Sequence, residues 1–113
     1  MNWKEQRRFL EEGETIKIRP QGESMVPLIG CGDLVTIEPA SEPINKGDIV
    51  FCKVHGKYYV HLVQAVQQKM GGYRYQIGNN KNRTNGTIGF EHIYGKVTHV
   101  EEKPVTKHNH EPD

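Results

Sequence analysis

From residue 14 onward, hydrophobic and polar positions alternate in short runs, as they do in β-strands that bury one face. Glycine, proline, asparagine and aspartate separate these runs, as expected at turns. The pattern predicts six strands, over residues 15–19, 34–38, 49–54, 57–67, 73–77 and 93–101. His55 and Gly56 are expected to make a two-residue hairpin turn, because glycine readily adopts the positive φ required there. The pattern indicates a mainly β fold, a strongly bent sheet or partly open barrel.

The N-terminal segment has a different pattern. Residues 3–12 place Trp3, Phe9 and Leu10 among charged side chains, and Gly13 follows as a natural helix end. This segment predicts one short helix that packs against the sheet as a cap.

The chain has 113 residues, a length typical of a single domain with one modest core. Residues 1–13 are expected to form the helical cap and residues 14–102 the main domain. Residues 103–113 are polar and contain two prolines, so a disordered tail is expected there.

Composition and charge argue against several classes of function. The 15 Lys and Arg residues nearly balance the 14 Asp and Glu residues, and the formal charge is +1. This balance disfavours broad electrostatic binding to nucleic acid, which needs a basic face. No apolar run approaches the roughly 20 residues of a membrane span, and the polar first residues do not resemble a secretory signal. A soluble, cytoplasmic protein is therefore expected.

Neither a cofactor nor a metal is expected. Cys31 and Cys52 lack a CxxC partner or a nearby cluster of ligands, which favours free thiols in a reducing compartment. His108 and His110 lie close together in the polar tail, but a histidine pair without further ligands is usually solvated.

One serine stands in a setting suited to nucleophilic chemistry. Ser24 lies in the segment GESMVP, between Gly22 and Pro27. Gly22 allows an unusual backbone conformation that can turn N–H groups toward a substrate oxygen, and Pro27 stiffens the chain after the serine. A plainer interpretation is that Ser24 caps a short helix that begins near Pro27.

Five further segments follow this serine in a characteristic order. They are CGDLVTIEP (31–39), KGDIVF (46–51), YVHLV (59–63), IGNNKNRTNG (77–86) and IYGKV (93–97). Together with GESMVP they resemble the clan of serine peptidases that includes the LexA-type repressors and the type I signal peptidases. The resemblance covers about residues 14–101, and it implies a LexA/signal-peptidase-like fold and peptide-bond hydrolysis.

The resemblance implies that Ser24 is the nucleophile and that His61 occupies the position of the general base. Most members have a lysine there, whereas the endoplasmic-reticulum and archaeal signal peptidases have a histidine. Histidine titrates near neutral pH without the desolvation that a lysine base needs. Leu62 departs from the basic residue that often follows the base.

Other parts of the site also depart from the family pattern. Gly22 lacks the hydroxyl that can assist the oxyanion hole, so the backbone N–H groups of Ser24 and Glu23 are assigned to it. Asn79 and Asn85 stand where signal peptidases carry aspartates. Asparagine can orient an imidazole but cannot stabilise its charged form. Three interpretations stay open: low activity, Asp48 as the third group, or a site that has decayed.

Two functions fit these features. The first is a serine endopeptidase that cleaves a protein or leader peptide in trans through a Ser24–His61 dyad. Its substrate would be an extended segment lying beside a strand edge, with small residues at the cleavage point. Self-cleavage is not expected, because the 23 residues before Ser24 contain no alanine and no long linker. The alternative is a non-catalytic module that binds a peptide or protein in a degenerate peptidase site, and a DNA-binding regulator is disfavoured by the charge balance.

Overall fold

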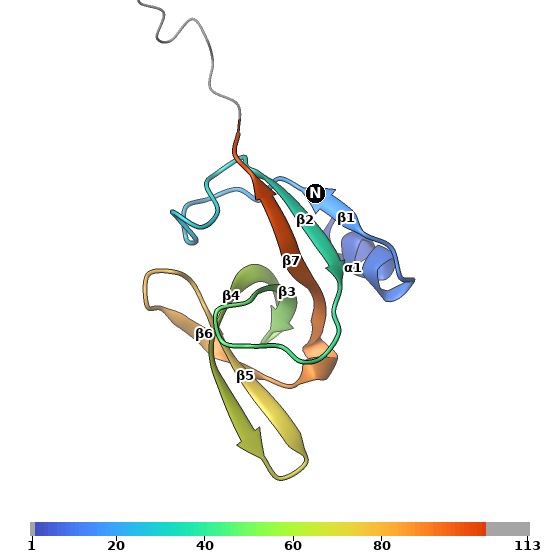
Figure 1. Cartoon of the computed structure of the whole chain (residues 1–113), viewed down its shortest axis with the longest axis vertical. Coiled ribbons are helices and arrows are strands. Elements are labelled where there is room, and N and C mark those ends of the chain that lie inside the picture. The colour runs from blue at the N-terminus through green and yellow to red at the C-terminus, as the bar shows by residue number, and fades with distance from the viewer. Residues whose placement is uncertain (1, 104–113) are drawn as a thin grey trace, which may run out of the picture.

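The computed structural model describes residues 2–103, which form one helix followed by a single seven-stranded antiparallel sheet (Figure 1). The predicted tail beyond Lys103, with His108 and His110, lies outside the described residues. The elements are α1 (Trp3–Glu11), β1 (Ile16–Ile18), β2 (Leu34–Pro39), β3 (Ile49–Val54), β4 (Lys57–Lys69), β5 (Gly72–Gly78), β6 (Thr84–Ile88), the 3-10 turn η1 (Phe90–His92) and β7 (Ile93–Glu101). The mainly β prediction is confirmed, and the sheet is bent without closing into a barrel.

The number of strands differs from the prediction, because β6 falls partly within a segment expected to be a polar loop. Its residues Thr84 to Thr87 are polar or glycine, and only Ile88 is buried. The strand forms by backbone pairing with β5, in the register Ile77↔Gly86 and Tyr75↔Ile88. Because four of its five residues are polar or glycine, no alternation of hydrophobic and polar residues marks this strand in the sequence.

The order of strands in the sheet is β1-β2-β7-β3-β4-β5-β6, so the last strand of the chain lies between β2 and β3. The long β4–β5 hairpin extends away from the part of the sheet that carries α1 (Figure 1). His55 and Gly56 connect β3 to β4 with φ of 49° and 83°, as the predicted two-residue turn requires.

Two clusters of buried side chains form the core. The first lies beneath α1 and consists of Leu10, Ile16, Ile18, Met25, Ile29, Val35, Ile37, Phe51, Val60 and Tyr94. The second is built mainly by β3 to β6 and consists of Ile44, Val50, Cys52, Val54, Val63, Tyr75, Ile77, Ile88 and Ile93. Neighbouring residues Phe51 and Cys52 belong to different clusters, so the central strands separate two cores.

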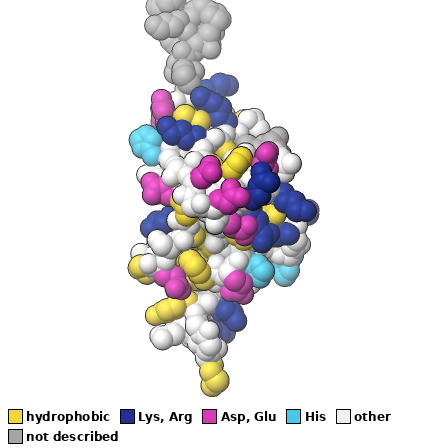
Figure 2. Space-filling model, turned by 90° about the vertical axis from the view of Figure 1, so that its right-hand side faces the viewer, with side chains coloured by type: hydrophobic (Ala, Val, Ile, Leu, Met, Phe, Trp, Pro, Cys, Tyr) yellow, Lys and Arg dark blue, Asp and Glu magenta, His cyan; other side chains and the backbone are white. Residues whose placement is uncertain are grey.

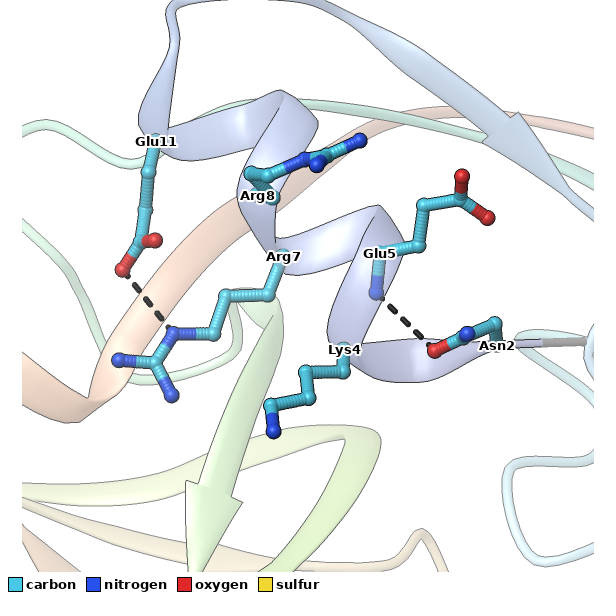
Figure 3. A pocket seen from close by; sticks show the side chains of 6 residues that line it. All are labelled: Asn2, Lys4, Glu5, Arg7, Arg8 and Glu11. Carbon is cyan, nitrogen blue, oxygen red and sulfur yellow. Dashed lines mark hydrogen bonds and ion pairs between the residues drawn. The ribbon is translucent and has the colours of Figure 1, made fainter.

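The outer face of α1 is polar and is held by local contacts (Figure 3). Asn2 caps the helix, since its Oδ1 accepts a hydrogen bond from the Glu5 N–H at 3.1 Å. One turn further on, Arg7 Nε donates to Glu11 Oε2 at 3.0 Å. The Arg7 guanidinium also lies over the ring of Tyr94, 4.3 Å from its centroid. These contacts support the predicted N-terminal helix, which is confirmed.

The surface on the α1 side mixes charges of both signs. In Figure 2, Lys and Arg side chains alternate with Asp and Glu side chains on this face. Within residues 2–103, no helix has both the length and the apolar character that crossing a membrane requires.

Replacing Gly95 by alanine should destabilise the fold. Gly95 lies on β7, where an added Cβ would meet the Ile37 side chain and would come within 2.9 Å of Leu10 Cδ1. Overpacking of this kind typically costs about 1–3 kcal/mol of unfolding free energy, which urea denaturation measures. His99→Ala, at an exposed position of the same strand, is the control and should change the free energy by less than about 0.5 kcal/mol. A Gly95→Ala protein as stable as wild type would contradict the packing of α1 on β7.

Candidate active site

The side chains of Ser24 and His61 are in direct contact, although the two residues are far apart in the sequence. Ser24 belongs to the loop between β1 and β2, and His61 lies on β4. The distance from Ser24 Oγ to His61 Nε2 is 3.1 Å, and both side chains are half-buried. A hydroxyl and an imidazole nitrogen at this separation are within the range needed for direct proton transfer.

A third side chain continues this contact. The Oδ1 atom of Asn85, on β6, lies 2.6 Å from His61 Nδ1. An amide oxygen only accepts hydrogen bonds, so this contact places the imidazole proton on Nδ1. The other ring nitrogen, Nε2, is then left with a lone pair directed at the Ser24 hydroxyl. Asn85 thus holds the histidine in the tautomer that a general base requires.

The surroundings of His61 also keep it neutral. Burial lowers the pKa of the imidazole below its usual 6.5, and the hydrogen bond with Asn85 offsets part of that lowering. The ring of Tyr59 is stacked near the imidazole, with centroids 4.8 Å apart. At neutral pH the lone pair on Nε2 is therefore available to accept a proton.

Contacts made by residues before and after Ser24 hold its loop in place. Gly22 has φ of +99°, and its N–H contacts Cys31 Sγ at 3.5 Å. The next residue after the serine, Met25, and Ile29 are buried in the first core cluster. The Leu28 N–H donates to Met25 O at 2.8 Å, which closes a turn after Ser24. The segment forms turns, and the short helix of the plainer interpretation is not observed.

Asn80 joins this loop to the β5–β6 connection, a role that the sequence did not reveal. Its backbone N–H donates to Ser24 O at 2.9 Å, and its Nδ2 donates to Val26 O at 3.0 Å. These two contacts link segments more than 50 residues apart in the chain. A polar loop rich in asparagine carries no signal for such a contact, because the same composition is typical of ordinary turns.

Of the two asparagines proposed to orient the imidazole, only Asn85 contacts it. Asn79 Oδ1 instead accepts hydrogen bonds from the backbone N–H groups of Lys81 and Arg83, at 2.8 and 3.0 Å. Asn79 therefore shapes the turn that precedes β6, the strand on which Asn85 lies.

Asp48, the alternative third group, has other partners. Its Oδ2 accepts a hydrogen bond from the Asn45 N–H at 2.8 Å and lies 3.4 Å from Lys96 Nζ. The side chain in contact with His61 Nδ1 is thus a neutral amide and not a carboxylate.

The two backbone N–H groups assigned to the oxyanion hole have no hydrogen-bond partner among the described residues. Among residues 2–103, neither the Glu23 N–H nor the Ser24 N–H donates a backbone hydrogen bond. Glu23 directly follows Gly22 and Ser24 comes one residue later, so the positive φ of Gly22 sets the direction of the chain that carries both groups. Their role in binding a substrate oxygen stays a prediction.

A small cavity opens beside the Ser24–His61 pair. Its volume is about 150 Å³, and both side chains line it. The other residues that line the cavity are Trp3, Pro20, Gln21, Gly22, Met25, Ile29, Tyr58, Tyr59 and Val60. Apolar, aromatic and polar groups share this lining, and its small volume suits a small side chain.

Among residues 2–103, no group of three or more His, Cys, Asp or Glu side chains is arranged to hold a metal ion. Cys31 is exposed and Cys52 is buried, and both are free thiols. Burial raises the pKa of Cys52 to about 12, so this thiol stays protonated.

The mainly β fold and a serine facing a histidine in one cavity are features of peptidase-like proteins. The family model described as Peptidase S24-like matches residues 3–98. This match spans most of the chain, and the chain belongs to the Peptidase S24-like family. No curated protein matches the sequence.

Proposed function

We propose that this protein is a serine endopeptidase that cleaves a separate protein or leader peptide through Ser24 and His61. The observation that carries the proposal is the series of contacts from Asn85 through His61 to Ser24, with distances of 2.6 and 3.1 Å. A histidine base that is oriented by a third side chain and hydrogen-bonded to a serine hydroxyl is the arrangement that activates a nucleophile.

The reaction follows from these contacts. His61 Nε2 accepts the Ser24 proton while Oγ bonds to the substrate carbonyl carbon, and the Ser24 and Glu23 N–H groups stabilise the resulting oxyanion. His61 then donates that proton to the departing amine, which leaves an acyl group on Oγ. Water attacks this ester after giving a proton to His61. The proton returns to Oγ as the acid product leaves.

The substrate binds as an extended strand beside β4. Residues 57–62 of β4 pair with β3 on one side, whereas β5 pairs with β4 only from Leu62 onward. On that second side, residues 57–61 therefore have no paired strand among the described residues, and His61 lies at the end of this stretch. A peptide added here would gain backbone hydrogen bonds and would pass close to Ser24. The 150 Å³ cavity supports a small side chain at the cleaved bond.

One observation favours the second candidate function, a non-catalytic module that binds a peptide or protein. The group bonded to His61 Nδ1 is a neutral amide, which cannot stabilise the imidazolium by charge. The Peptidase S24-like family also includes non-catalytic members.

A fluorophosphonate probe separates these two functions, because it reacts with serines activated for nucleophilic attack. Wild-type protein and Ser24→Ala are incubated with the probe at about pH 6–9, the range in which a histidine base becomes neutral, and intact-mass spectrometry measures labelling. We expect labelling of wild type at Ser24 and none of Ser24→Ala, together with Ser24-dependent cleavage in a peptide library. An unlabelled wild-type protein that binds library peptides would favour the binding module.

A further inference from the structure

We propose that Trp3 determines the size of the substrate side chain that the site accepts, an inference that rests on the proposed peptidase function. Trp3 is the first residue of α1, far in sequence from the nucleophile and the base. Its side chain nevertheless lines the same cavity as Ser24 and His61. A helix outside the series of family motifs thus contributes directly to the substrate site.

The position of Trp3 is rigid because α1 is attached to the sheet at several points. The Trp3 ring packs against Phe51 on β3, with centroids 5.3 Å apart. Leu10 is buried in the first core cluster at the other end of the helix. Between them, Arg7 reaches the Tyr58 hydroxyl at 3.4 Å. The indole therefore acts as a fixed wall, and it does not move aside easily for a larger ligand.

Three other walls of the cavity are also part of the core. Met25, Ile29 and Val60 are buried and belong to the first core cluster, so their sizes are set by core packing. Trp3 is only partly buried and packs against that cluster from outside. Its bulk fills space that a longer substrate side chain would need. Trp3 is therefore a wall at which the size of the accepted side chain can change without removing a buried member of the core.

The test uses capped aminoalkyl phosphonate diphenyl esters, which phosphonylate an active serine and carry one side chain beside the phosphorus. The series presents the side chains of alanine, valine, leucine and phenylalanine, and mass spectrometry follows the inactivation rate at Ser24. Wild type should react fastest with the alanine compound. Trp3→Ala should raise the rate with the leucine or phenylalanine compound, relative to alanine, by about tenfold or more.

Phe9→Ala is the matched control. Phe9 lies on the same helix and packs against the same core cluster, but it does not line the cavity. It should lower the melting temperature and leave the side-chain preference unchanged. Trp3→Leu keeps an apolar side chain and replaces Trp3→Ala if that variant fails to fold. A folded Trp3 variant with the preference of wild type would overturn the proposal.

A second measurement tests the role of Trp3 separately from catalysis. Trp3 is the only tryptophan in the sequence, so its fluorescence reports on ligand binding in the cavity. If no phosphonate modifies wild type, the Ser24→Ala protein is titrated with capped peptides that carry the same four side chains. Binding of the alanine peptide with a change in tryptophan fluorescence, and weaker binding of the phenylalanine peptide, would support the role of Trp3 without catalysis. Absence of any fluorescence change at saturating peptide would refute it.

Discussion

Replacing His61 by alanine is expected to lower Ser24-dependent kcat/KM on the order of 10⁴-fold. The Ser24 hydroxyl would lose the only base within hydrogen-bond reach that the described residues provide, the Nε2 atom at 3.1 Å. Hydrolysis of a peptide selected from the library is the measurement, and the rate of fluorophosphonate labelling is an independent one. His99→Ala, at an exposed histidine on β7, is the matched control and should retain full activity.

The pH dependence of the wild type tests the same role. Burial holds the pKa of His61 below 6.5, and the active form is the neutral imidazole. Activity should therefore rise as the pH increases through a value below 6.5 and should level off above it. A lysine base would place that rise at a higher pH. Activity that keeps increasing above about pH 8, or a His61→Ala protein as active as His99→Ala, would exclude His61 as the base.

The sequence predicted those parts of the fold that depend on side-chain alternation and turn chemistry. The β3–β4 hairpin is an example, because His55 and Gly56 fit the turn and the flanking runs alternate. Strand β6 was missed for the opposite reason. Its polar residues pair through the backbone and bury little, so no hydrophobic period marks them.

The candidate site was predictable mainly through the order of the sequence motifs. That order resembles a clan of serine peptidases and implied Ser24 as nucleophile and His61 as base, and the two side chains lie 3.1 Å apart. The sequence could not show whether Asn79 or Asn85 contacts the imidazole, because the pairing register of β5 and β6 decides which amide reaches it. Trp3 was assigned to a helical cap, and only the packing of that helix brings its ring into the cavity.

Substitutions of Asn85 should change both the rate and the pH profile, in opposite directions for alanine and aspartate. Asn85→Ala removes the acceptor 2.6 Å from His61 Nδ1, so the imidazole loses its fixed tautomer, and kcat should fall by about 10²-fold. Asn85→Asp places a negative charge beside the ring, which favours the protonated form and raises the pKa of His61. The acidic limb of the rate profile should then move to higher pH.

At about pH 8, above that limb, the carboxylate introduced by Asn85→Asp would stabilise the imidazolium that forms during attack, and kcat should exceed the wild-type value by about tenfold. NMR titration of the His61 ring signals measures the pKa directly, and rates from about pH 5 to 9 give the matching limb. Asn79→Ala is the control, because the Asn79 side chain accepts hydrogen bonds from backbone groups of its own turn and does not contact His61, and it should keep the wild-type pH profile. If Asn85→Asp left both the His61 pKa and the limb unchanged, the contact between Asn85 and the imidazole would have no part in the reaction. Under the proposed function, the neutral amide at this position predicts slow turnover with a base of low pKa, and a single added charge is expected to reverse both properties together.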